Sequence, residues 1–143
     1  MSSGAATKPY TAWGTYGSSK AAVNHLSAHF AVEEPDITSI TVAPGRVNTD
    51  MQAVLRAQGK DTMAKAQYDT FVEAFEQGTL LKPEQPGNVI AGFVAEPSKE
   101  LSGKSVKYDP VTYQIIKMAI ANHEHKQLEL AGDGDMAGVA LAV

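Results

Sequence analysis

A tyrosine and a lysine four positions apart are the residues of this sequence best suited to acid–base chemistry. They are Tyr16 and Lys20, in the run Tyr-Gly-Ser-Ser-Lys. In a helix this spacing places the Tyr16 hydroxyl and the Lys20 ammonium on one face. A phenol has a pKa of about 10, and a neighbouring cation favours its phenolate and brings proton transfer toward neutral pH. The same pair also occurs on solvated helix surfaces, and spacing alone does not separate the two interpretations.

A serine hydroxyl is the third group that could join this chemistry. Ser3 lies thirteen residues before Tyr16, where it could end a strand and hydrogen-bond a substrate oxygen. We expect Ser3, Tyr16 and Lys20 to share one concave site.

The elements that must position these residues follow from the apolar pattern. Val23, Leu26 and Phe30 predict a helix over about 15–34, ended by Pro35. The β-branched run at 37–43, stopped by Pro-Gly, predicts a buried strand. Further predicted elements are a helix capped by Asp61 with Gly78 past its end, a helix over 84–95 that tolerates Pro86 in its first turn, a strand at 105–108 and a helix over about 111–120.

Strands separated by helices predict parallel β-α-β units and therefore an α/β fold. Two strands are too few for an independent parallel sheet, which normally has both faces covered. We therefore expect an exposed apolar patch around Val23, Leu26 and Phe30, and a tendency to dimerise or aggregate.

Composition narrows the class of protein further. The chain has 143 residues, a net charge of -4 and no cysteine, which argues against nucleic-acid binding and excludes disulfides and thiolate chemistry. No apolar run reaches the length of a membrane span, and the first residues lack the pattern of a signal peptide. His123-Glu124-His125 places its histidines on different helix faces, so we expect no metal site. We expect a cytoplasmic protein, and the apolar segment 136–143 has no assigned role.

Three segments resemble the short-chain dehydrogenase/reductase family in order and spacing. They are Ser-Ser-Gly-Ala-Ala from Ser2, Trp-Gly-Thr-Tyr-Gly-Ser-Ser-Lys from Trp13, and Val-Ala-Pro-Gly-Arg-Val-Asn-Thr-Asp from Val42. Trp13, the run Val-Glu-Glu-Pro at 32–35 and the pair Tyr108-Asp109 are most similar to the sepiapterin reductase and benzil reductase branch.

The resemblance implies a role for each matching residue. Tyr16 is similar to the general acid/base of the family, and Lys20 to the residue that lowers the tyrosine pKa and binds the nicotinamide ribose. Ser3, rather than its neighbour Ser2, is similar to the serine that holds the substrate oxygen. The resemblance also assigns a cofactor-binding loop and a carboxylate near the substrate pocket, at Pro44, Gly45, Val47 and Thr49 and at Asp109 respectively. A plain strand-ending turn at Pro-Gly and a capping role for Asp109 remain alternatives.

The family's glycine-rich turn, Thr-Gly-x-x-x-Gly-x-Gly, has no counterpart in this sequence. In the family its backbone amides hold the cofactor pyrophosphate. The Asn-Asn-Ala-Gly segment and the helix with a further catalytic asparagine are missing too. The resemblance therefore implies a partial Rossmann-like fold, a doubly wound parallel sheet without its amino-terminal dinucleotide-binding half. The catalytic portion would occupy residues 1–110, and a helical extension and tail residues 111–143.

Two functions follow as hypotheses. The first is a truncated oxidoreductase that uses NADP or NAD to reduce a small ketone or vicinal dicarbonyl. The second is a non-catalytic remnant or interaction protein that cannot bind the dinucleotide by itself, and a fragment of a longer reading frame would have the same sequence. A homo-oligomer or a complementing chain could complete the sheet.

Overall fold

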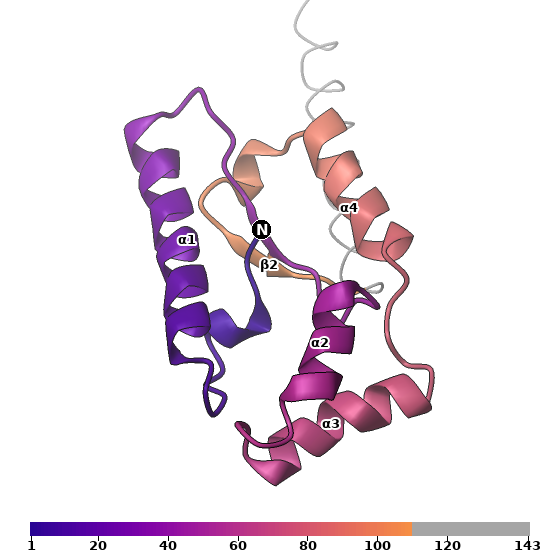
Figure 1. Cartoon of the computed structure of the whole chain (residues 1–143). Coiled ribbons are helices and arrows are strands. Elements are labelled where there is room, and N and C mark those ends of the chain that lie inside the picture. The colour runs from indigo at the N-terminus through magenta and orange to yellow at the C-terminus, as the bar shows by residue number, and fades with distance from the viewer. Residues whose placement is uncertain (110–143) are drawn as a thin grey trace, which may run out of the picture. The chain divides into compact units, whose positions relative to one another are not determined.

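The computed structural model describes residues 1–109, of which Met1–Tyr108 form one compact unit (Figure 1). The predictions for the helix at 111–120, for the His-Glu-His motif and for the apolar tail fall outside the described residues.

Two short parallel strands form the sheet, as the sequence predicted. Strand β1 (Thr41–Ala43) pairs with β2 (Ser105–Lys107), with Val42 opposite Val106. Residues 37–40 were expected to belong to the first strand, but the structure places them outside it. The backbone there is held by a turn instead, because Gly103 N donates to Ser39 O at 2.7 Å and Ser39 N donates to Ser102 Oγ at 3.2 Å.

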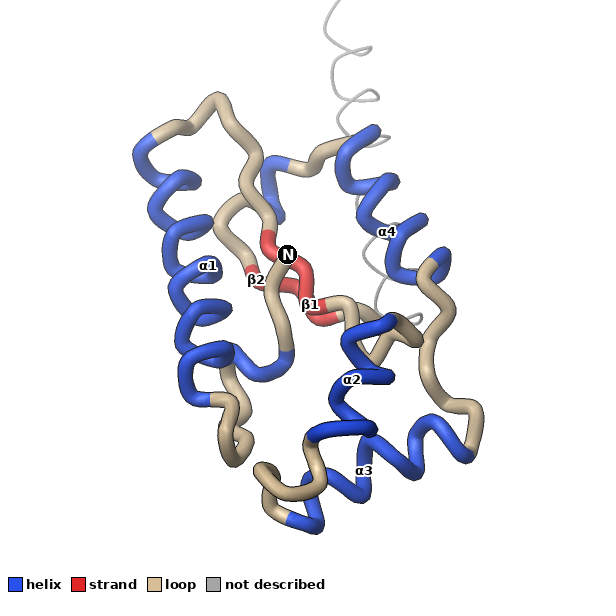
Figure 2. The backbone as a smooth tube through the Cα atoms, in the orientation of Figure 1, coloured by secondary structure: helices blue, strands red, loops and turns tan. Residues whose placement is uncertain are grey.

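The first residues of the chain lie along the other side of β1. Ser2 N donates to Val42 O at 2.8 Å, so β1 has a hydrogen-bonded neighbour on each side. Figure 2 shows the two strands between α1 (Gly14–Glu33) and α4 (Glu84–Ala95), with the amino terminus beside them. β1 is therefore the central segment of the described unit.

Helix α1 confirms the helix predicted over 15–34 and leaves much of its apolar stripe uncovered. Leu26 is 56% exposed and Phe30 is 42% exposed, whereas Val23 is half-buried. The expected lack of cover is thus confirmed at Leu26 and Phe30, while dimerisation stays a prediction.

Three helices follow β1, and the sequence anticipated them unequally. The predicted helix at 84–95 is confirmed by α4, in which Pro86 and Val89 are buried. Helix α3 (Lys65–Glu76) begins after Ala64, so the predicted cap at Asp61 is wrong. Helix α2 (Asp50–Gln58) was not predicted.

The core is small, and it contains few of the apolar side chains of residues 1–109. None of these side chains is completely withdrawn from solvent. The buried apolar residues are Ala5, Val42, Met63, Phe71, Ala74, Val89, Leu101 and Tyr108. Within the described part, no helix combines the length and the apolar character needed to cross a membrane.

We predict that Gly103→Ala lowers the free energy of unfolding more than Gly78→Ala. Both glycines have a positive φ, 77° and 64°, and an alanine in that conformation costs about 1–2 kcal/mol. At Gly103 a Cβ would also lie 2.9 Å from Ala31 Cβ of α1, and such overpacking adds about 1–3 kcal/mol. Urea unfolding followed by circular dichroism measures both losses, and equal losses would contradict this packing of α1.

Candidate active site

The first turns of α1 lie against the amino-terminal segment that contains Ser3. A Cβ on Gly17 would stand 2.7 Å from Ala5 O, so the two backbones approach closely. Lys20 Nζ donates to Met1 O at 3.4 Å. These contacts bring the Tyr16–Lys20 turn of the helix to the segment around Ser3.

Ser3 is half-buried, and its side chain caps a short 3₁₀ turn, η1 (Gly4–Ala6). Its Oγ accepts a hydrogen bond from Ala5 N at 3.2 Å. A hydroxyl that accepts at one lone pair still has its own O–H to donate. Ser2 is 6% exposed, and no residue of the described part hydrogen-bonds its Oγ. Ser3 is thus the more accessible donor of the two.

Tyr16 and Lys20 are both half-buried on α1. Lys20 Nζ lies 5.6 Å from the centroid of the Tyr16 ring, as expected for residues four apart on one helical face. An ammonium has three donors, and the bond to Met1 O is long, so Lys20 can still donate to a ligand.

Tyr16 belongs to an aromatic cluster that also contains Tyr10, Trp13 and Phe71. Trp13 meets Tyr16 edge-on, with ring centroids 5.5 Å apart, and also lies 5.5 Å from Phe71. Tyr10 contacts both Trp13 and Phe71, at 5.1 Å and 5.9 Å. No local pattern predicted this cluster, because Phe71 comes from α3, 55 residues after Tyr16. The rings of Trp13 and Phe71 thus form an apolar wall, which contacts the ring of Tyr16 through Trp13.

The Pro44–Thr49 loop follows the carboxyl end of β1 and is held by backbone hydrogen bonds to Leu81. Gly45 has a φ of 83°, which favours glycine, and its Cβ position lies 3.1 Å from Leu81 Cδ1. Leu81 N donates to Arg46 O at 2.9 Å, and Asn48 N donates to Leu81 O at 2.8 Å. The predicted cofactor loop is therefore held by backbone pairing along its length.

The other predicted residues of this loop, Val47, Thr49 and Pro44, also have defined positions in the structure. Val47 forms a parallel bridge with Leu81. Thr49 is the residue before α2, and its Oγ1 donates to Val47 O at 3.4 Å. Pro44 follows β1 directly and is half-buried. The sequence analysis assigned no role to Arg46, which lies inside the loop and whose side chain hydrogen-bonds α3.

The substrate role of Asp109 stays a prediction. Asp109 is exposed and belongs to the second unit of the chain. Residues 1–109 contain no group of three or more histidine, aspartate or glutamate side chains that could hold a metal ion.

Comparisons with known proteins point to one family. Residues 1–60 match the model of the short chain dehydrogenase family. The benzil reductase ((S)-benzoin forming) IRC24 of Saccharomyces cerevisiae is 36% identical over 113 residues, which are 76% of this chain and 43% of that protein. The sepiapterin reductase of Mus musculus is 41% identical over 61 residues, 43% of this chain and 23% of that protein.

A solved structure agrees with the sequence relatives. The short chain dehydrogenase/reductase YIR035C of Saccharomyces cerevisiae superposes with a TM-score of 0.74 at 37% identity, over 78% of this chain and 45% of that one. The chain thus spans less than half the length of the relatives it matches.

We predict that Phe71→Ala destabilises the protein far more than Phe75→Ala on the same helix. Phe71 is 3% exposed and lies in the aromatic cluster, and removing such a ring costs about 3–5 kcal/mol. Phe75 is 49% exposed, and loss of its cation–π contact with Arg56 costs about 1 kcal/mol or less. Urea unfolding gives the two values, with the fluorescence of Trp13 as a local probe. A similar loss in both variants would show that the cluster is not part of the core.

Proposed function

The chain belongs to the short-chain dehydrogenase/reductase family, in its benzil reductase and sepiapterin reductase branch, and on that premise we propose that it carries the proton-transfer side of a carbonyl reductase site. The observation that supports the proposal is the contact of the Tyr16–Lys20 turn with the segment around Ser3. Members of this family use NAD or NADP, and the proposed cofactor is one of these two.

The residues present fit one end of such a cofactor. Lys20 has ammonium donors that could bind the ribose hydroxyls next to the nicotinamide. The Pro44–Thr49 loop leaves the carboxyl end of a parallel strand, which is where open α/β sheets bind their ligands. For the pyrophosphate, the sequence has no glycine-rich turn that opens a helix. The fit is therefore to the nicotinamide end alone.

The proposed chemistry divides the two hydrogen atoms of the reduction between cofactor and protein. The bound cofactor supplies a hydride to the carbonyl carbon of the substrate. Ser3 donates its O–H to the carbonyl oxygen and holds it, and Tyr16 transfers its hydroxyl proton to the same oxygen. The Lys20 ammonium then stabilises the Tyr16 phenolate by its charge. The hydride, which the reduced cofactor would supply, and the proton from Tyr16 would together convert a ketone to a secondary alcohol.

The aromatic cluster supports an aryl carbonyl compound as the substrate class. Trp13, which is half-buried, presents apolar ring surface next to Tyr16, and aromatic rings bind flat apolar groups by stacking or edge-on contact. The name of the yeast relative, a benzil reductase, fits the same class of substrate.

A non-catalytic interaction protein is the second candidate. Two observations favour it, the lack of a pyrophosphate-binding turn in the sequence and the exposure of Leu26 and Phe30 on α1. The two candidates differ in whether the chain can ever take up a dinucleotide.

We predict that this chain by itself shows no saturable binding of NADPH at micromolar concentration. Loss of two or three charge-assisted hydrogen bonds to the pyrophosphate, at about 1.5–3 kcal/mol each, weakens binding by about three or more orders of magnitude. Titration with NADPH, followed by the fluorescence of the single tryptophan, measures this binding. Saturable binding of micromolar NADPH by this chain alone would contradict the prediction, because the chain would then bind the dinucleotide without a glycine-rich turn.

We further predict that the amino-terminal half of a family member, added in trans, restores both NADPH binding and benzil reduction. Tyr16→Phe should then abolish reduction and keep cofactor binding. Ser3→Ala should lower the rate by about 10²–10³-fold, as loss of a donor to a developing oxyanion does, while Ser2→Ala serves as the matched control and stays near the unmodified rate. Binding without any reduction would support the second candidate.

A further inference from the structure

Arg46 lies in the Pro44–Thr49 loop, but its side chain binds α3. Its Nη1 donates to Thr70 O at 2.7 Å, and its Nη2 donates to Thr70 Oγ1 at 3.0 Å. The guanidinium carbon lies 4.6 Å from the centroid of the Phe71 ring. Three contacts of one planar group thus connect the loop to two consecutive residues of the helix.

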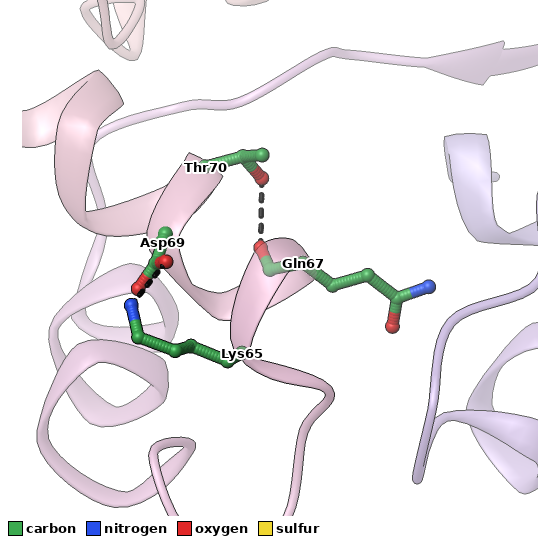
Figure 3. Close-up of polar contacts among 4 residues, drawn as sticks. All are labelled: Lys65, Gln67, Asp69 and Thr70. Carbon is green, nitrogen blue, oxygen red and sulfur yellow. Dashed lines mark hydrogen bonds and ion pairs between the residues drawn. The ribbon is translucent and has the colours of Figure 1, made fainter.

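The α3 side of this contact is prepared to receive a donor. Thr70 Oγ1 donates its own proton to Gln67 O at 2.8 Å, as Figure 3 shows, which leaves the lone pairs of the hydroxyl to accept from Arg46. In the same figure the side chain of Gln67 points away from Thr70, and its Oε1 accepts from Thr11 N at 2.8 Å. α3 is therefore held by Arg46 at Thr70 and by the loop that leads to Trp13 at Gln67.

A neighbouring ion pair on α3 is separate from this network. Lys65 Nζ lies 2.6 Å from Asp69 Oδ2 (Figure 3), and the hydrogen bond to Asp69, followed by its charge, raises the pKa of Lys65. Lys65 is exposed and its partner belongs to the same helix, so the pair is screened by solvent and does not attach α3 to another element.

Arg46 links two parts of the candidate site. Its backbone oxygen accepts from Leu81 N at 2.9 Å, in the pairing that holds the proposed nicotinamide loop. Its guanidinium covers Phe71, which contacts Trp13, which in turn contacts Tyr16. A displacement of α3 would therefore move the apolar wall beside Tyr16 relative to the loop.

We propose that Arg46 is a positioning residue that holds α3 and the aromatic cluster in one fixed arrangement with the Pro44–Thr49 loop. The purpose of this positioning, the orientation of a substrate between wall and cofactor, rests on the proposed function. The coupling of loop, α3 and cluster stands without it. A lysine cannot replace Arg46, because two parallel donors and a flat face are both required.

Arg56 of α2 provides a matched control, because its guanidinium also contacts α3. Its guanidinium carbon lies 3.9 Å from the centroid of the Phe75 ring, so it too covers a phenylalanine of α3. Phe75 is exposed and has no ring contact with the aromatic cluster among the described residues. Loss of Arg56 removes a similar stacking contact without touching Trp13.

The first test needs no cofactor and uses the full chain. Acrylamide quenching of the single tryptophan is compared in the unmodified chain and in Arg46→Met, Arg46→Lys and Arg56→Met. We expect stronger quenching and a red-shifted emission in both Arg46 variants, and no change in Arg56→Met. If Arg46→Met fails to fold, Thr70→Val, which removes one acceptor of Arg46, should give the same shift in smaller size. Unchanged fluorescence in Arg46→Lys would overturn the proposal.

The second test separates positioning from mere stabilisation. With the amino-terminal half supplied in trans, benzil reduction gives benzoin, whose enantiomeric ratio does not depend on how much protein is folded. We expect Arg46→Lys to lower this ratio severalfold and to lower kcat by up to about 10²-fold with little change in KM, whereas Arg56→Lys keeps the ratio. An unchanged ratio in Arg46→Lys would overturn the positioning role. Absence of any reduction in the unmodified complex would instead refute the proposed function, and the fluorescence test would still decide the coupling.

Discussion

The backbone pairing of β1 is the constraint on which the candidate site depends. Val42 O accepts from Ser2 N on one side of this three-residue strand, and β2 pairs with it on the other. Ser3 comes one residue after the first of these contacts, and Pro44 follows the strand directly. Both the proposed substrate-holding serine and the proposed cofactor loop are therefore fixed by the same few hydrogen bonds. Because Thr41 and Val42 are buried, these bonds are shielded from competing water.

The side chains of α3 connect this arrangement to the aromatic cluster that contains Tyr16. Phe71 belongs to the small core and also touches Trp13, so the same ring stabilises the fold and shapes the wall next to Tyr16. Such double use follows from the limited apolar burial of the described unit. Rings that belong to the core cannot be loosened without loss of stability, which favours a fixed arrangement of the cluster over an adaptable one.

Sequence periodicity was sufficient for the regular elements with strong local signals. The predicted bounds of α4 agree with the structure, those of α1 differ by one residue at each end, and the parallel pairing of β1 and β2 is confirmed. Local signals were less reliable where tertiary contacts compete. Residues 37–40 have strand-forming side chains but bond to the turn at Ser102–Gly103, and α2 has an apolar pattern, at Met51, Val54 and Leu55, that was left unassigned. The chemistry-bearing residues could be named from spacing and resemblance, whereas the aromatic cluster and the reach of Arg46 depend on contacts across 24 to 61 residues, which no local pattern encodes.

In the proposed site, anchoring of the dinucleotide and stabilisation of the transition state would fall to different sets of residues. Contacts to the pyrophosphate hold ground state and transition state equally, and uniform binding of this kind lowers Kd or KM without accelerating the chemical step. Ser3, Tyr16 and Lys20 would act instead where charge develops, on the carbonyl oxygen and on the phenolate, so their contribution grows as the reaction proceeds. The structure holds these residues on helix α1 and on the amino-terminal segment beside β1, whose backbones leave no room for a Cβ on Gly17 next to Ala5. Uniform binding could be supplied by any surface that anchors the dinucleotide in the right place, whereas the proposed transition-state contacts would depend on how β1, α1 and α3 position Ser3, Tyr16 and Lys20.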